Sequence, residues 1–138
     1  IVMRSKSDFS ETLELAIAGR LDEAEIEWDR RTALGVVLAA ANYPATPRTG
    51  DLITRLAPDT AESVVFHAGT RLDEDGLKTS GGRVLCVTAL GDSIKRAQAA
   101  AYDAVARTHF NGQQYRRDIG WRALPTTGGT ASDKEPSK

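Results

Sequence analysis

The fold is decided by one stretch of the sequence, Arg83-Val84-Leu85-Cys86-Val87-Thr88-Ala89-Leu90-Gly91-Asp92. Residues 83–90 are rich in Val, Leu and Thr, which predicts a buried strand. Asp92 is a good N-cap for the longest predicted helix, which runs from Ser93 to about Thr108. The apolar residues of this helix form a narrow stripe of small side chains, which lets the helix lie close to a sheet: Ile94, Ala97, Ala101, Ala104 and Val105.

Further strands are predicted before this one. Residues 33–41 are almost wholly apolar and predict a buried strand, and residues 64–70 predict another. Residues 72–77 have the composition of a hairpin turn, whereas residues 51–60 are ambiguous between a strand and a short helical turn. Strands followed by one long helix are typical of an α+β domain. We therefore expect a small, mainly antiparallel sheet with one long packed helix.

The first thirty residues differ from the rest, because they carry four basic and eight acidic side chains. Ser7 can cap a short amphipathic helix that begins at Asp8, and Gly19 can close it. Residues 21–30 alternate like an edge strand. The apolar stripe of the helix must be buried against something; it consists of Phe9, Leu13, Ala16 and Ile17.

Composition excludes several classes of protein. The chain has 138 residues, of which 41% are hydrophobic and 27% charged, as in one ordinary soluble domain. The net charge of −1 argues against a nucleic-acid partner held by overall charge, and no segment is long and apolar enough to predict a membrane span. The single cysteine fits a reducing, cytoplasmic compartment. Residues 125–138 lack core-forming side chains and predict a disordered tail.

Two segments could bind an anion. Gly81 and Gly82 can point their N–H groups at an anion, and Arg83 adds a bidentate donor. A flexible loop before a strand, with a solvated arginine, explains the same residues. Arg117 beside Asp118 could present an oriented guanidinium to a carboxylate or phosphate, or could form an ordinary surface salt bridge.

Other chemically versatile residues are more simply explained as structural. His67 lies within a predicted strand and is typical of a hydrogen-bonded structural histidine. Cys86 lies in an apolar strand without an evident base, and Trp121 is expected to pack rather than to stack on a ligand. Two histidines and one cysteine are too few for a typical structural zinc site. We therefore predict no catalytic residue and no metal ligand in this chain.

Ordered blocks of the sequence resemble the phosphoribosylamine–glycine ligase family, from Ile1 to about Leu124. The blocks are Phe66-His67-Ala68-Gly69-Thr70, Gly81-Gly82-Arg83-Val84-Leu85-Cys86-Val87-Thr88-Ala89-Leu90-Gly91 and Arg117-Asp118-Ile119-Gly120-Trp121-Arg122-Ala123. The resemblance implies that residues 1–30 end an ATP-grasp domain and that residues 31–124 form the C-terminal domain. This domain is similar to the rudiment single-hybrid-like module found at the end of biotin carboxylases.

The resemblance also implies an activity. The family joins glycine to 5-phosphoribosylamine through a glycyl phosphate, giving glycinamide ribonucleotide, ADP and phosphate in purine biosynthesis. The family's ATP- and magnesium-binding segments have no counterpart here, and the chain opens without an initiator methionine. We therefore expect a C-terminal fragment that is inactive alone and whose partners are the small-molecule substrates and the rest of the ATP-grasp domain.

Site residues carry over from the resemblance as expectations. Gly81, Gly82 and Arg83 would face phosphoribosylamine, and Arg117 and Asp118 would orient it. Two other interpretations remain: the C-terminal domain of a biotin-carboxylase-type enzyme, and a free-standing module that binds a sugar phosphate. Asn42 stands where the family tends to have glycine, which predicts a positive φ there.

Overall fold

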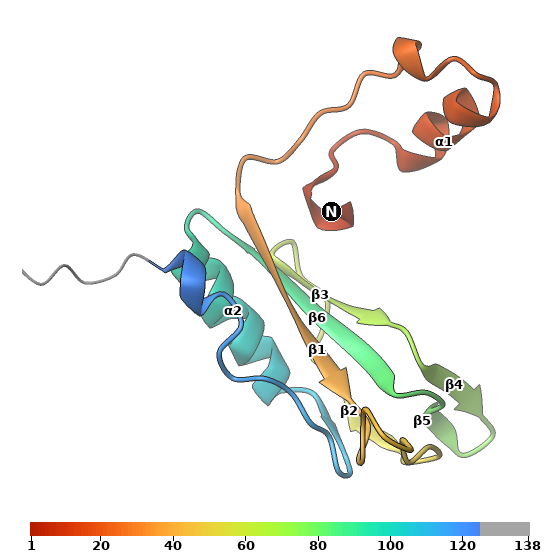
Figure 1. Cartoon of the computed structure of the whole chain (residues 1–138), viewed down its shortest axis with the longest axis vertical. Helices are drawn as coiled ribbons and strands as arrows, with labels where there is room; N and C mark the ends of the chain where they lie inside the picture. The colour runs from red at the N-terminus through yellow and green to blue at the C-terminus, as the bar shows by residue number, and fades with distance from the viewer. Residues whose placement is uncertain (125–138) are drawn as a thin grey trace, which may run out of the picture.

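A three-stranded antiparallel sheet organises the computed structural model, which describes residues 1–124. The strand order is β1 (Thr32–Ala39), β6 (Arg83–Gly91) and β3 (Ser63–His67), so β6 is the central strand (Figure 1). The predicted tail, residues 125–138, lies outside the described residues. The predicted α+β class with a small antiparallel sheet is confirmed.

The helix α2 (Ile94–Ala106) covers one face of this sheet (Figure 1). Ala97, Ala101 and Ala104 are completely buried, as the small-residue stripe predicts. The helix approaches the end of β6 so closely that a Cβ on Gly91 would lie 2.4 Å from the backbone nitrogen of Ala97. Small side chains are therefore what allows the helix to lie on the sheet.

The cap of α2 differs from the prediction by one residue. Ser93 is the N-cap, and its hydroxyl accepts a hydrogen bond from the N–H of Arg96 at 3.3 Å. The Asp92 carboxylate instead pairs with the Arg96 side chain at 3.5 Å. Both residues are good caps by type, so the sequence alone did not decide between them.

Two smaller strand pairs complete the domain. β4 (Thr70–Asp73) and β5 (Gly76–Thr79) form the predicted hairpin, and the expected strand over 64–70 therefore ends at His67. The ambiguous segment contains β2 (Ile53–Arg55), which pairs with β7 (His109–Phe110). No pattern predicted β7, because it is only two residues long.

The outer edges of the sheet are partly covered. At the edge of β3, the Asp59 carboxylate accepts a hydrogen bond from the N–H of Val65 at 3.0 Å. At the edge of β1, Ala39 and Gln114 exchange two backbone hydrogen bonds of 2.8 Å. This second contact holds the segment after β7 beside the end of β1.

The N-terminal segment, residues 1–31, contains η1 (Val2–Arg4), α1 (Phe9–Ile17) and η2 (Leu21–Glu23). Figure 1 shows α1 extending away from the sheet. The predicted edge strand over 21–30 is wrong, because the segment forms η2 and then a single bridge between Ser5 and Trp28. An isolated bridge satisfies few backbone groups, so the alternating side chains do not produce a strand.

Local signals nevertheless define α1. Asp8, and not Ser7, is the N-cap, and its carboxylate accepts from the N–H groups of Ser10 and Glu11. The Ser7 hydroxyl instead donates to the carbonyl oxygen of Glu25 at 3.0 Å. Gly19 closes the helix with a φ of +70°, as predicted.

Candidate functional site

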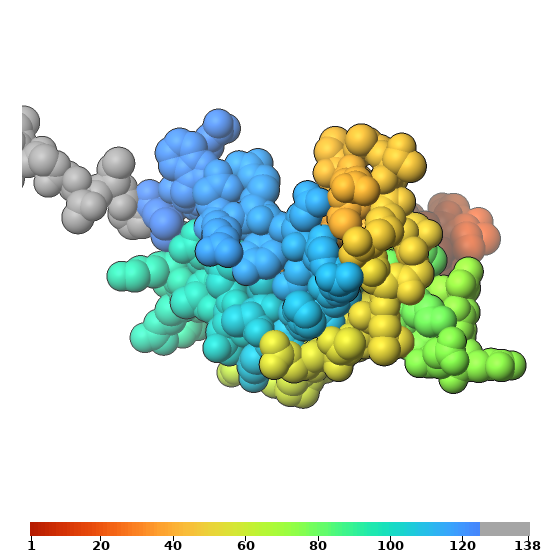
Figure 2. Space-filling view, turned by 90° about the horizontal axis from the view of Figure 1, so that it is seen from below, coloured from red at the N-terminus to blue at the C-terminus, as the bar shows by residue number. Residues whose placement is uncertain are grey.

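A hollow of about 370 Å³ lies beside the end of β1 and the start of β6. Figure 2 shows the surface notched between the segment after β7, in blue, and the loop after β1, in orange to yellow. The hollow combines apolar and aromatic side chains with two arginines. It is lined by Val37, Ala39, Tyr43, Arg83, Gln114, Tyr115 and Arg116.

Close packing beside this hollow requires glycine at positions 82 and 69. A Cβ on Gly82 would lie 2.6 Å from Cδ2 of Tyr43, and a Cβ on Gly69 would lie 2.8 Å from Cα of Gly81. Neither the N–H of Gly81 nor that of Gly82 donates a hydrogen bond to any residue within 1–124. Neither glycine is among the residues that line the hollow; Gly82 adjoins it through Tyr43 and Arg83.

Arg83 begins β6, so the central strand of the sheet fixes its backbone. Its side chain is exposed and lines the hollow. It forms no ion pair with another residue in the described part of the chain. A guanidinium without a carboxylate partner is suited to bind an anion from solution.

The structure corrects the predicted pairing of Arg117 with Asp118. Arg116 makes that pair: its Nε and Nη2 donate to the two carboxylate oxygens of Asp118 at 2.9 and 2.7 Å. The guanidinium of Arg117 instead lies over the ring of Tyr115, 5.9 Å from its centroid. The chain bends at Arg117, and the side chains on either side of this bend, Arg116 and Asp118, meet.

The Arg116–Asp118 pair is solvent-exposed, with 70% and 52% of the side chains accessible. The hydrogen bonds from Arg116 lower the pKa of Asp118 below its ordinary value. Because water screens such pairs, its main effect is to orient the guanidinium rather than to stabilise the fold. Asp118 therefore remains ionised and holds Arg116 in one orientation beside the hollow.

Sequence reasoning missed Tyr43, Gln114, Tyr115 and Arg116 as lining residues. Tyr43 belongs to the loop after β1, and the Ala39–Gln114 bridge helps to bring residues 114–116 to it. One local signal was available in this loop: Asn42 has the predicted positive φ, 68°.

The residues expected to be structural show no second site. The Nδ1 atom of His67 lies 3.2 Å from the hydroxyl of Thr70. Cys86 is half-buried, with its sulfur 3.6 Å from the hydroxyl of Thr88. Trp121 differs from the expectation of packing, because 55% of it is exposed and the Arg122 guanidinium lies 5.3 Å from its ring centroid.

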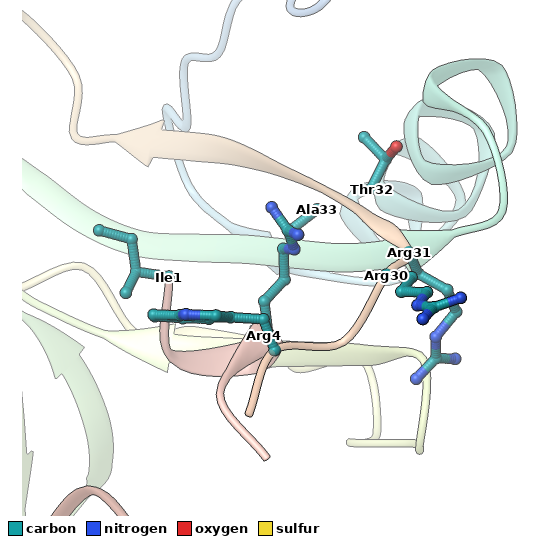
Figure 3. Close-up of a pocket in the computed structure, with 7 residues that line it drawn as sticks. Ile1, Arg4, Arg30, Arg31, Thr32 and Ala33 are labelled. Carbon is teal, nitrogen blue, oxygen red and sulfur yellow. The ribbon is translucent and has the colours of Figure 1, made fainter. Parts of the chain in front are cut away.

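A second, wider hollow of about 690 Å³ lies where the N-terminal segment meets β1 (Figure 3). The Nη2 atom of Arg31 lies 2.7 Å from Oδ2 of Asp29, with which it forms an ion pair. Arg4 donates from Nε to the carbonyl oxygen of Asp29 at 3.0 Å. Figure 3 shows Arg30 and Arg31 together at one end and Arg4 apart from them. The three guanidinium groups do not converge, so we assign no anion to this hollow.

The fold defines the class of protein as an α+β domain, in which one long helix covers a small antiparallel sheet. The structure is similar to the crystal structure of phosphoribosylamine–glycine ligase from Thermotoga maritima, with a TM-score of 0.65 and 35% sequence identity. This similarity covers 80% of this chain and 28% of that chain. The family model "Phosphoribosylglycinamide synthetase, C domain" matches residues 33–122, and the chain belongs to this family.

Curated relatives agree with this family. A phosphoribosylamine–glycine ligase from Ralstonia nicotianae is 58% identical over 124 residues, which are 90% of this chain and 29% of the relative. One from Escherichia coli O6:H1 is 50% identical over 126 residues, again 90% of this chain and 29% of the relative. The chain thus spans about three-tenths of the length of these relatives.

Proposed function

We propose that this chain serves as the C-terminal part of a ligase that joins glycine to 5-phosphoribosylamine in purine biosynthesis, in the cytoplasm. The products would be glycinamide ribonucleotide, ADP and phosphate. The observation that carries the proposal is the 58% identity, over 90% of this chain, to a relative named phosphoribosylamine–glycine ligase. The relatives' names do not favour the carboxylase interpretation.

ATP and Mg²⁺ are assigned to the part of the ligase that lies outside this chain. Within residues 1–124, no group of three or more His, Cys, Asp or Glu side chains is arranged to hold a metal ion. We derive no phosphoryl-transfer step from the residues of this chain. Among the described helices, none has both the length and the apolar character needed to cross a bilayer.

The hollow beside β1 is proposed to contact the sugar phosphate. The N–H groups of Gly81 and Gly82 and the guanidinium of Arg83 supply donors that suit a phosphate group. Arg116 adds a second guanidinium, and Asp118 orients it through two hydrogen bonds. Arg117 contributes positive charge from its place over Tyr115.

Residues 1–30 are proposed to end the ATP-grasp domain, with residues 31–124 as the separate C-terminal domain. Phe9, Leu13 and Ile17 remain 55%, 48% and 88% exposed. Three apolar side chains on one helix face are expected to pack against a protein surface. We propose that this surface belongs to the rest of the ATP-grasp domain.

The decisive experiment replaces Arg83 by Ala in a complete ligase that carries this segment. We expect the KM for phosphoribosylamine to rise about tenfold or more, since a charge-assisted hydrogen bond contributes about 1.5–3 kcal/mol. The KM for ATP should remain unchanged. Steady-state kinetics with each substrate varied in turn measures both values.

Arg71→Ala is the matched control. Arg71 lies on β4, pairs with Asp73 at 2.7 Å and is not among the residues that line the hollow. Its replacement should leave both KM values unchanged. An Arg83→Ala ligase with an unchanged KM for phosphoribosylamine would remove Arg83 from the site. A free-standing sugar-phosphate module, the remaining alternative, would show binding without any turnover in the complete protein.

A further inference from the structure

Tyr102 connects the helix α2 to the wall of the hollow. Its hydroxyl donates a hydrogen bond to the carbonyl oxygen of Arg116 at 2.7 Å. The same hydroxyl accepts a hydrogen bond from the N–H of Ile119 at 3.0 Å. One side-chain atom therefore holds the backbone at both ends of the segment 116–119.

The ring of Tyr102 supports this segment as well. It packs against the ring of Tyr115, with 6.4 Å between the centroids and an angle of 46° between the planes. Gln98, one turn earlier on α2, donates from Nε2 to the carbonyl oxygen of Ile119 at 2.7 Å. Within residues 1–124, Tyr102 is the residue whose side chain forms a hydrogen bond with the backbone of Arg116.

The two arginines of the hollow are thus positioned in different ways. Arg83 lies on the central strand, whose pairing with β1 and β3 fixes its backbone. Arg116 lies outside the strands and helices, so its backbone needs another support. Asp118 orients the guanidinium of Arg116, but Asp118 belongs to the same loop and cannot hold that loop in place.

We infer that Tyr102 is a positioning residue, which places Arg116 so that it acts together with Arg83 on a phosphate monoester in the hollow. The inference rests on the proposed function, because it assumes a sugar phosphate at this site. Binding groups that are already in place cost less conformational entropy when the ligand arrives. Removing the Tyr102 hydroxyl should therefore weaken binding through Arg116, without removing any group that contacts the ligand.

The test uses the 138-residue chain with ribose 5-phosphate as the probe, and inorganic phosphate and ribose as separate ligands. An NMR titration that follows the amide signals of Gly81 and Gly82 gives the Kd. We expect Tyr102→Phe to weaken binding of ribose 5-phosphate about three- to tenfold, as expected for lost hydrogen bonds. Inorganic phosphate should show the same loss, whereas ribose should shift these signals little.

A double-mutant cycle separates positioning from a general structural effect. Arg116→Ala should weaken binding, and adding Tyr102→Phe to it should cause no further loss, because Tyr102 acts through Arg116. Thr54→Val is the matched control, since it removes a different hydroxyl hydrogen bond, 3.3 Å long, to the carbonyl oxygen of His109. This control should leave the Kd unchanged.

Each other outcome has a distinct meaning. If the wild-type chain and Arg116→Ala differ in Kd but Tyr102→Phe equals wild type, the inference is wrong and the proposed site stands. Additive losses in the cycle, or a lowered thermal midpoint with an unchanged Kd, also overturn it. If the wild-type chain binds neither ribose 5-phosphate nor phosphate, the proposed sugar-phosphate site fails as well.

Discussion

Residues 1–31 and residues 32–124 both contain amphipathic elements, but only the second region encloses a core. In the second region Phe110, Leu38 and Leu85 are completely buried. In the first region no residue is buried, and Phe9 and Ile17 are 55% and 88% exposed. The same kind of apolar periodicity therefore has two outcomes, which depend on whether a partner surface is present.

The helix α1 shows what capping residues do in the absence of packing. The helix α1 has an aspartate cap, and at its end Gly19 and Arg20 donate to the carbonyl oxygens of Ala16 and Leu15. Such signals define where a helix begins and ends. They do not stabilise nine residues in water, because most helical stability in proteins comes from packing.

The largest expected change in the free energy of unfolding comes from replacing phenylalanine by alanine, which can be done in both regions. Phe110→Ala should lower the free energy of unfolding by about 3–5 kcal/mol, because it opens a cavity in a closed core. Phe9→Ala should change it by less than about 0.5 kcal/mol, because its ring is already largely in water. Urea unfolding followed by circular dichroism measures both. Equal losses would show that α1 belongs to the same cooperative unit as the sheet.

A smaller effect is expected from glycine substitutions in the two regions. Gly91→Ala should cost about 1–3 kcal/mol, because its Cβ would lie 2.4 Å from the Ala97 nitrogen and would push α2 off the sheet. A Cβ on Gly19 would meet nothing within 4 Å, and only its φ of +70° opposes alanine. Gly19→Ala should therefore reduce helicity but preserve the urea midpoint of the sheet. A Gly91→Ala protein with wild-type stability would contradict the close contact of α2 with β6.

The smallest effect is expected at the junction of the regions, where Asp29 pairs with Arg31. Hydrogen bonds from Arg31 lower the pKa of Asp29 to about 2. Because the folded-state pKa lies below the unfolded value of about 3.9, the pair stabilises the folded state above about pH 4. That contribution is lost as the pH falls toward 2.

Thermal unfolding of wild type and Asp29→Asn between pH 2 and pH 6 measures this contribution. The wild-type midpoint should exceed that of the variant above about pH 4, and the difference should shrink steadily toward pH 2. Arg31→Ala should reproduce the effect, since it removes the other partner. A difference that does not depend on pH would assign the loss to packing rather than to the ionised carboxylate.

Most of the fold could be predicted from the sequence, because its elements carry strong periodic signals. The apolar run of β1 and the alanine stripe of α2 are examples, as is the hairpin at residues 72–77. The failures share a cause. β7 has two residues and no periodicity, and residues 21–30 alternate but have no neighbouring strand along their length. Pairing partners, which the local sequence does not contain, decide such segments.

The site could be predicted only in part. Gly81, Gly82 and Arg83 are consecutive, so a local pattern was sufficient to select them, and their role in binding stays a prediction. The opposite wall depends on the bridge between Ala39 and Gln114, residues that are far apart in the sequence. The pairing of Arg116 with Asp118 depends on the bend of the chain at Arg117, and the adjacency of Arg117 and Asp118 was misleading.

The Asp59 carboxylate protects the outer edge of β3 from pairing with a strand of another molecule. A strand from another molecule that approached this edge would need the N–H of Val65, which is already occupied. It would also place its own carbonyl oxygen against a negative charge. A single acidic side chain thereby discourages intermolecular β-pairing, which is the first step toward aggregation.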